Sequence, residues 1–271
     1  MNYEGHGGPS RKFAANVGDI YTNVDTGDKY ELDSIVSTKL IKNNSIEEEI
    51  EYFWELIHEE NGGSGGASDA DQLIERTITE ISSNAASVGA RAFYYCPKLT
   101  TVDLPKATSI GEYAFYFCDP LKTVNIPSAT SIGSNAFNNC SLMTTINMPK
   151  VATVGTYAFN YCSALKSVDL PSATVVDTRA FVYCSELTTV DLASPVTINS
   201  YAFENCSKLK TLLLRSETVA TLGATNAFSN TAISKGTGYI YVPRALVDTY
   251  KSAANWSTYA NQFRAIEDYV A

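Results

Sequence analysis

The sequence is poor in positive charge, in histidine and in long apolar runs. It has 20 lysines and arginines against 29 aspartates and glutamates, a formal net charge of -9, and two histidines, His6 and His58. A negative chain is a poor ligand for nucleic-acid phosphates and for anionic lipid. No run of 18 apolar residues occurs, so no segment is expected to span a membrane. We therefore expect neither nucleic acid nor a membrane as a partner.

Motifs for catalysis and for metal binding are also missing. The sequence has no G-x-S-x-G, H-E-x-x-H or phosphate-loop pattern, and no C-x-x-C pair. These absences favour a protein that is not an enzyme, with no catalytic residues, no metal and no cofactor. Residues 1 to 18 lack the apolar stretch of a secretory signal, so no signal peptide is expected there.

What is present is a repeat, because one cysteine returns at a constant interval along the chain. The cysteines are Cys96, Cys118, Cys140, Cys162, Cys184 and Cys206. Each follows Ala-Phe at the same offset, and the unit reads A-F-x-x-C-x-x-L-x-x-V-x-L-P, then a variable stretch and I-G. A single unit cannot bury these apolar groups alone, so neighbouring units must stack around one continuous core. The fold class is a repeat solenoid of 22-residue rungs with short parallel strands.

Six cysteines suggest a disulfide framework, but their spacing argues against it. Cysteines that occupy the same place in each rung form a ladder with a spacing of about 4.8 Å and parallel Cβ directions. Parallel Cβ directions do not suit a disulfide. We predict six reduced, buried thiols that behave as small apolar groups.

Within a rung, alternation places Val102 and Leu104 in the core and Thr101 and Asp103 outside. A proline follows the strand in four rungs and ends it, because proline has no N–H to donate. One further position carries residue types that tolerate positive φ, which predicts a left-handed turn there. Its residues are Gly111, Gly133, Gly155, Asp177 and Asn199. The A-F-x-x-C segment is short and predicts a 3₁₀ or single helical turn.

Four segments are expected. They are an N-terminal hairpin-containing module (1–60), a Gly/Ser linker (61–70), the solenoid (71–230) and a C-terminal cap (231–271). The hairpin pairs Ile20, Tyr21 and Thr22 with Lys29 to Leu32 around D-T-G-D. Residues 45–60 have helix-like apolar spacing, with a strand ending at 52–57 as the alternative.

Both ends of the repeat depart from its period. Counting back one period from Val102 and Leu104 gives Glu80 and Ser82, so the first rung has an imperfect register, as expected of a terminal rung. The interval from Phe203 to the next equivalent phenylalanine, Phe228, is longer than one period, which indicates a three-residue insertion. A strand, YIYV, and helical turns with an apolar face, to which Phe263 is expected to belong, then close the array.

The unit LTTVDLPKATSIGEYAFYFC resembles the bacterial BspA-like leucine-rich repeat, over about residues 77 to 228 and the ending IYVPRALVDTYKSAANWSTYA. This resemblance implies a curved, right-handed leucine-rich-repeat solenoid with a strand on one face of each rung. It also implies a non-enzymatic protein of a bacterial surface or a phage tail, used in adhesion and recognition. Separately, GDIYTNVDTGDKYEL followed by FWELI resembles a short module of phage tail and minor structural proteins. Ala193 and Arg215 depart from the family pattern, because each stands where the strand-ending proline is expected.

Two surfaces are candidates for ligand binding. The outward strand positions form a hydroxyl column and an amide column, which suit a glycan; alternatively, Thr is only a good strand residue and Asn/Asp ladders hydrogen-bond along the stack. This strand face holds Thr101, Asp103, Thr123, Asn125, Thr145, Asn147, Ser167, Asp169, Thr189 and Asp191. The second candidate is an aromatic edge, which could stack on sugar or protein, although half of it is expected to lie between rungs. It holds Tyr94, Tyr95, Tyr116, Phe117, Tyr161 and Tyr183.

Three functional classes are weighed. The leading hypothesis is a recognition protein of a phage or prophage tail that binds a host-surface glycan or protein, because it unites the tail-like N-terminus, the linker and the missing signal. Residues 1 to 60 are then expected to contact other tail or surface proteins. The alternative is a cell-surface or secreted BspA-like adhesin, located at the cell surface or outside the cell. An enzyme is disfavoured by the missing motifs.

Overall fold

A computed structural model describes residues 2–5, 20–23, 29–31 and 78–270 of the chain. Three N-terminal strands are present, β1 (Asn2–Gly5), β2 (Ile20–Asn23) and β3 (Lys29–Glu31). β2 and β3 pair antiparallel, so the predicted hairpin pairing is confirmed. β1 pairs parallel with β2, which the sequence did not indicate. The expected helix over 45–60 and the linker over 61–70 lie outside the described residues.

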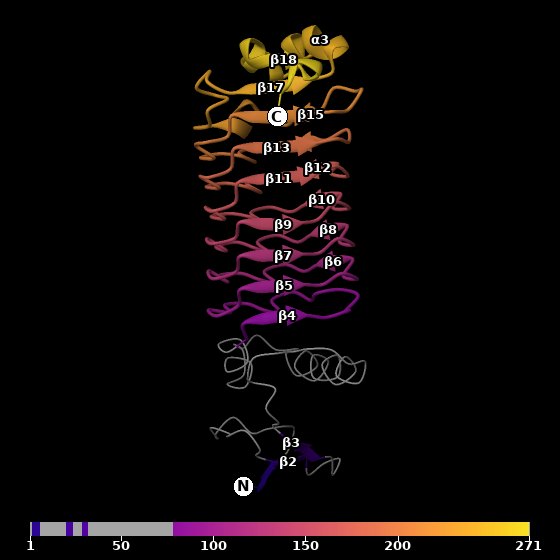
Figure 1. The fold of residues 1–271 in the computed structure, drawn as a ribbon, viewed down its shortest axis with the longest axis vertical. Coiled ribbons are helices and arrows are strands. Elements are labelled where there is room, and N and C mark those ends of the chain that lie inside the picture. The colour runs from indigo at the N-terminus through magenta and orange to yellow at the C-terminus, as the bar shows by residue number, and fades with distance from the viewer. Residues whose placement is uncertain (1, 6–19, 24–28, 32–77, 271) are drawn as a thin grey trace.

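The front face of the solenoid is a stack of parallel strands, one from each rung (Figure 1). The strands are β4 (Glu80–Ser82), β5 (Thr101–Asp103), β7 (Thr123–Asn125), β9 (Thr145–Asn147), β11 (Ser167–Leu170), β13 (Thr189–Leu192), β15 (Thr211–Leu214), β17 (Tyr239–Val242) and β18 (Phe263–Ala265). Alternate residues of these strands point into the core, as the sequence predicted, so the repeat solenoid is confirmed.

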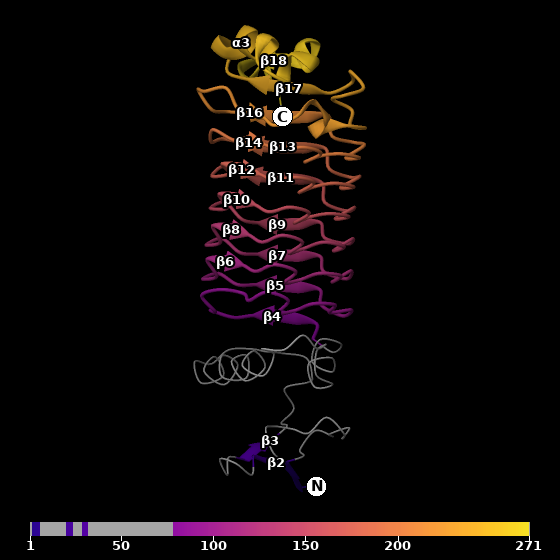
Figure 2. The same ribbon diagram turned by 180° about the vertical axis from the view of Figure 1, so that it is seen from behind.

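A second, shorter strand follows the front strand in each of the six rungs from β5 to β15, and these strands form a continuous parallel sheet (Figure 2). The back strands are β6 (Ser109–Ile110), β8 (Ser131–Ile132), β10 (Thr153–Val154), β12 (Val175–Val176), β14 (Thr197–Ile198) and β16 (Thr221–Leu222). The sequence did not predict these strands, because each is too short for a period of two to be recognised.

The first rung is in register, but with a shorter period. β4 pairs with β5 so that Ile81 lies opposite Val102, an offset that is shorter by one than the offset between later rungs. Ile81 is 5% exposed and fills the same core position as Val102. The expected departure of the first rung from the 22-residue period is therefore confirmed; its core residue stays in line because the loop of this rung is shorter.

Stacked phenylalanines form the axis of the core. Rings of Phe115, Phe137 and Phe159 lie 5.1 and 5.3 Å apart with interplanar angles of 5° and 6°. The stack continues to Phe228, where Tyr259 meets the last ring edge-on at 5.5 Å. Each ring is buried by its neighbours in the adjacent rungs, so the core cannot form from one unit alone.

All six cysteines are free and buried, as predicted. They are more than apolar fillers, because the thiols from Cys118 to Cys206 each donate a hydrogen bond to a phenylalanine carbonyl of the preceding rung. Cys162 Sγ, for example, donates to Phe137 O at 3.2 Å. Burial raises the pKa of the Cys140, Cys162 and Cys206 thiols well above their usual range. These three thiols therefore stay protonated and act as donors between rungs.

The predicted left-handed turn at Gly111 and its equivalents is wrong. The left-handed residues lie two and six positions later in each rung, where φ is near +60°. Glycine is needed at Gly111 for another reason: a Cβ there would lie 2.6 Å from the backbone of Gly89 and Ala90. The rungs approach each other closely at this point, so the glycine signal reflects contact between backbones.

The A-F-x-x-C segment forms overlapping hydrogen-bonded turns, and the predicted 3₁₀ turn occurs only in the last rung of the described solenoid, as η2 (Thr225–Phe228). In a central rung, Ala136 N donates to Gly133 O at 3.3 Å and Cys140 N donates to Phe137 O at 3.3 Å. Alternate N–H groups donate instead to the next rung, as Phe137 N does to Ala158 O at 2.8 Å. The turn edge is thus a third hydrogen-bonded face of the solenoid.

The predicted insertion before Phe228 is confirmed and is divided around β16. Thr197 pairs with Thr221, so most of the extra length precedes β16 and the rest follows it. The cap that follows consists of η3 (Arg244–Leu246), α3 (Val247–Ser252), η4 (Trp256–Gln262) and η5 (Ile266–Asp268). Phe263 lies in β18 and not in the helical turn predicted for it, because this segment pairs with β17 and extends the front face by one strand.

Polar tips of cap side chains satisfy the open backbone of the last rung. Ala220 N donates to Tyr250 Oη at 2.8 Å, and Trp256 Nε1 donates to Ala220 O at 2.7 Å. Asn255 Nδ2 donates to Leu222 O at 2.6 Å. Because an unpaired strand edge invites pairing with another chain, these contacts close the C-terminal end of the array.

Candidate functional site

The hydroxyl column runs along the front face as predicted. Thr101 pairs with Thr123, and Thr123 with Thr145, in register on adjacent strands. Ser167 pairs with Thr189 in the same way. These side chains are half-buried or exposed, whereas the residues that follow them in each strand point into the core. The column is therefore a straight row of hydroxyls on a rigid support.

The amide column beside it is partly linked by side-chain hydrogen bonds. Asn125 Nδ2 donates to Asp103 Oδ1 at 2.7 Å, and Asn147 Nδ2 donates to Asn125 Oδ1 at 2.7 Å. The alternative that these residues form a ladder is thus correct for the rungs of β5, β7 and β9. The donors all point towards the N-terminal end, so Asn147 Oδ1 remains as the acceptor at the other end of the ladder.

Beyond Asn147 the column becomes acidic. Arg215 donates to both carboxylate oxygens of Asp191 at 2.7 Å, and thereby neutralises that residue. Asp169 has no such partner, because the residue at the same distance along the chain from Asp169 as Arg215 is from Asp191 is Ala193, which is uncharged. Partial burial, and next the neighbouring Asp191 carboxylate, raise the pKa of Asp169 above its ordinary value. Asp169 is exposed and has no hydrogen-bond partner among the described side chains.

The C-terminal end of the front face is covered. Thr211 and Leu213 occupy the outward positions of β15, and both are buried. Tyr269, near the end of the chain, contacts Tyr241 of β17 with ring centroids 4.9 Å apart. Accessible strand-face residues therefore end at Thr189 and Asp191, which are themselves half-buried.

The aromatic edge forms two stacked groups. Tyr94 stacks on Tyr116 at 5.0 Å, and Tyr161 stacks on Tyr183 at 4.5 Å. Tyr95 is 52% exposed and has a positive φ of 60°. A left-handed bulky residue costs about 1 to 3 kcal/mol. Some other rungs carry asparagine at this position, which tolerates a positive φ at lower cost. A strained tyrosine here indicates a role other than folding, so the aromatic edge is the second candidate surface. Phe117 belongs to this edge and is half-buried.

The edge is interrupted in the middle by asparagines that bond to one another. Asn138 Nδ2 donates to Asn135 Oδ1 at 2.8 Å, and Asn160 Nδ2 donates to Asn138 Oδ1 at 2.9 Å. Because these amides are satisfied within the rungs, they offer less to a ligand than the tyrosines do. The predicted aromatic edge is consequently two separate patches.

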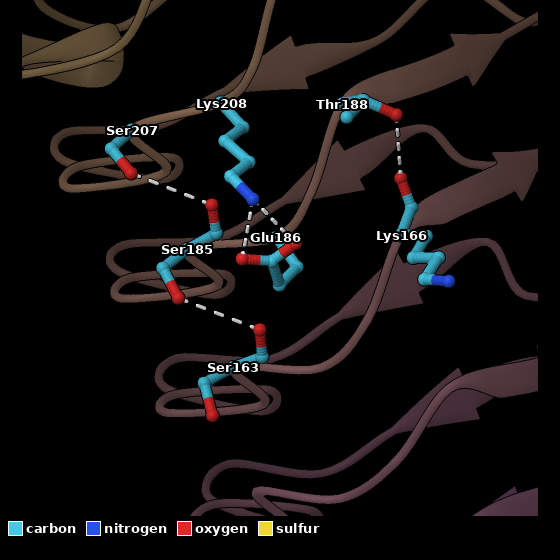
Figure 3. A network of polar contacts seen from close by, with 7 residues as sticks. All are labelled: Ser163, Lys166, Ser185, Glu186, Thr188, Ser207 and Lys208. Atoms are coloured by element: carbon cyan, nitrogen blue, oxygen red, sulfur yellow. Dashed lines mark hydrogen bonds and ion pairs between the residues drawn. The ribbon is translucent and has the colours of Figure 1, made fainter.

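Short polar side chains tie the rungs together beside the front strands (Figure 3). Ser185 Oγ donates to Ser163 O at 3.5 Å, and Ser207 Oγ donates to Ser185 O at 3.4 Å. Lys208 Nζ lies 2.7 Å from both carboxylate oxygens of Glu186. Serine occupies this position in four consecutive rungs, from Ser141 to Ser207, and these serines stabilise the stack, so we assign them no role in binding.

The described part of the chain contains neither a cluster of metal-ligating side chains nor a membrane-spanning helix. No group of three or more His, Cys, Asp or Glu side chains is placed there to hold an ion. No helix there is both long and apolar enough to cross a bilayer.

Comparison with known families explains the repeat. The BspA type leucine rich repeat region matches residues 74–185 and 130–243, with six copies. The chain belongs to this family. Leucine-rich repeats of the BspA type are typically scaffolds for interactions rather than enzymes, and their proteins are typically found at the surface or outside the cell. The match begins at residue 74, so the likeness of the N-terminal segment to phage tail modules is not supported.

Solved structures of several bacterial proteins are similar to this chain. One from Eubacterium ventriosum is 30% identical, covers 58% of this chain and 44% of its own, and has a TM-score of 0.50. One from Bacteroides ovatus is 27% identical, with coverage of 61% and 43% and a TM-score of 0.44. The pneumococcal vaccine antigen PcpA is 16% identical, with coverage of 67% and 43% and a TM-score of 0.49. The chain spans less than half the length of these proteins, and no curated protein matches it.

Proposed function

We propose that the protein is a non-catalytic recognition protein whose front face binds a glycan or protein on a host surface. The observation that carries this proposal is the column of hydroxyls and amides held in register on a closed, fully buried core. Hydroxyls and amides each donate and accept hydrogen bonds, as sugar hydroxyls do. A rigid row of such groups gains affinity because little conformational freedom is lost on binding.

The leading location is a phage or prophage tail, and it rests on the likeness of residues 18–32 and 53–57 to tail modules. A bacterial surface or secreted adhesin is the alternative, and the typical location of BspA-type proteins favours it. The adjacent genes separate the two: tail, baseplate or lysis genes support the first, and a signal peptide or cell-wall anchor in the full gene supports the second.

The test of the binding face is a triple substitution of Asn125, Asn147 and Asp169 by alanine. We expect binding to host cells or to an array of glycans to be lost, with the melting transition nearly unchanged, because these side chains are partly or fully exposed. A Tyr94→Ala and Tyr116→Ala double variant is the control for the aromatic edge. Normal binding by the triple variant and loss in the double variant would move the site to that edge.

Normal binding by both variants would exclude both surfaces. Recognition would then reside in residues 1–60 or in the caps, and the solenoid would serve as a spacer. Binding to cells after enzymatic removal of surface glycans would indicate a protein ligand.

A further inference from the structure

The front face is divided at one place, between β9 and β11. Its strands form two sheets, β4-β5-β7-β9 and β11-β13-β15-β17-β18, which are not hydrogen-bonded to each other. In the same rungs, the back strands β10 and β12 are paired. Figure 1 shows β9 and β11 farther apart than their neighbours on either side. The break is therefore local to the front face, and we name it the front gap.

The front gap is bounded at both ends by hydrogen bonds between the same two rungs. Ala164 N donates to Ser141 O at 3.1 Å before the strands, and Thr174 N donates to Ala152 O at 2.8 Å after them. A further strand inside the gap would need about twice the usual separation of 4.7 to 4.9 Å. Rungs joined on both sides cannot separate that far, so insertion of a peptide strand is disfavoured.

Backbone groups of β9 face the front gap. Successive residues of a strand turn their N–H and C=O groups to opposite neighbours. Thr145 N donates to Lys122 O at 3.2 Å, on the β7 side, and residue 147 faces the same way. The backbone groups of Ile146 and Met148 therefore point towards β11, with which β9 has no pairing.

The opposite wall is formed in the same way by β11. Thr188 N donates to Lys166 O at 2.9 Å, so residues 166 and 168 face β13. The backbone groups of Ser167 and Asp169 consequently face the gap. Since unpaired backbone groups are costly unless water or a ligand satisfies them, both walls present donors and acceptors that are open to a partner.

Side chains make the gap accessible. Ile146 is half-buried, whereas Val124 and Val168, at the same position in the adjacent rungs, are 1% and 3% exposed. Of the four outward side chains beside the gap, Thr145, Asn147, Ser167 and Asp169, all are exposed. On this stretch of the face, backbone and side-chain groups with unused hydrogen-bonding capacity lie together.

We propose that the front gap is the binding site for a neutral, hydroxyl-rich glycan, an inference that rests on the proposed function. A sugar hydroxyl accepts from one N–H and donates to one C=O, so it can bridge the two walls as a water molecule does. Asn147 Oδ1 and the Asp169 carboxylate add acceptors at the rim. A neutral sugar is favoured because an acidic one would be repelled by Asp169.

The first test needs no ligand. Amide hydrogen exchange, measured by NMR on the full chain, should show Ile146 and Asp169 exchanging at least tenfold faster than Val124 and Val190, which lie in paired strands. Equal protection at all four positions would show that the ladder is closed in solution and would overturn the inference.

The second test uses an array of neutral oligosaccharides and two matched variants, Ser167→Arg and Thr123→Arg. Both residues are exposed members of the hydroxyl column, but only Ser167 borders the gap. For an oligosaccharide that the array retains, Ser167→Arg should weaken binding at least tenfold, and Thr123→Arg should weaken it by a factor at least fivefold smaller, because Thr123 lies outside the gap. The same oligosaccharide should slow exchange at Ile146 and Asp169.

Other outcomes overturn the inference in distinguishable ways. Equal weakening by both variants would spread recognition over the whole column, and the proposed function would stand without the gap. Retained binding in both variants would place the site elsewhere. An array without any bound oligosaccharide, or protein binding lost on Leu142→Ser at this half-exposed leucine before β9, would show that the ligand is not a neutral glycan.

Discussion

The back sheet and the front face are built from the same 22-residue units, yet only the back sheet is continuous. Beside the back strands, Gly111, Gly133 and Gly155 bring the backbones of neighbouring rungs into contact, which sets the distance between rungs there. On the front face, proline after the strand removes one donor in each of four rungs. The rungs are therefore held together at the back sheet and at the turns, while strand pairing on the front face can be lost between two rungs.

Ala193 and Arg215 show what happens on the front face when the proline is absent. Both stand where the proline is expected, directly after β13 and β15, and these strands are one residue longer than β5, β7 and β9. β11 has the same greater length, although Pro171 follows it, and its last residue, Leu170, pairs with Leu192 of β13. Arg215 N donates to Leu192 O at 2.9 Å, a bond that proline could not make. Where the donor is restored, the front ladder extends.

The largest effect is expected in the shared core. Phe159 is fully buried between Phe137 and Phe181, at ring distances of 5.3 and 5.0 Å. Phe159→Ala should therefore lower the free energy of unfolding by roughly 3–5 kcal/mol, as judged by chemical denaturation. Phe93→Ala should cost less, because Phe93 is 8% exposed near the N-terminal end. Equal losses would mean that the first rung is as well packed as the middle.

A smaller but diagnostic effect is expected at the back sheet. A Cβ on residue 133 would lie 2.7 Å from the backbone of Gly111 and Glu112, so Gly133→Ala must push two rungs apart. We expect a loss of about 1–3 kcal/mol in chemical denaturation. The control Ser167→Ala, on the exposed front face, should be nearly neutral. If Ser167→Ala lowered the free energy of unfolding and Gly133→Ala left it unchanged, the comparison between the two faces would be reversed.

The thiols test whether the core is closed along its length. All six cysteines are buried, so alkylation of the native protein should be slow. After denaturation without reductant, mass spectrometry should find all six modified. Fewer than six modified thiols would reveal disulfides between rungs. Cys162→Ala, which removes the hydrogen bond to Phe137 O, should cost about 1 kcal/mol.

The smallest effect concerns charge on the front face. The pKa of Asp169 is raised in the folded protein, so ionisation costs stability above the ordinary value of 3.8, and that cost disappears as pH falls below it. Asp169→Asn should raise the melting temperature slightly at pH 7, by the equivalent of about a few tenths of a kcal/mol because the group is exposed, and not at all near pH 3. Asp191→Asn should lower it, since Arg215 loses its bidentate partner. A change of melting temperature in the same direction for both variants would show that the two carboxylates share one environment.

Much of the fold follows from the repeat. The period, the inward positions, the free cysteines and the insertion before Phe228 were all predictable, because every rung must place the same residue types in the same core. The strand face was predictable for the same reason, since Thr101 and Asp103 alternate with buried residues. The glycine positions were recognised but misinterpreted, because close contact between backbones and a positive φ leave the same signal in one sequence.

The sequence by itself determined that this chain is a stack of 22-residue rungs with a hydroxyl and an amide column outside, because burial acts on every unit alike. Only the tertiary structure decided where neighbouring rungs pair and where they part. Rungs with similar patterns, V-x-I, I-x-M or V-x-L, pair at β7 and β9 but not at β9 and β11. Strand pairing depends on the accumulated position of both rungs, held by the back sheet and the turns, and no single unit of sequence contains that position.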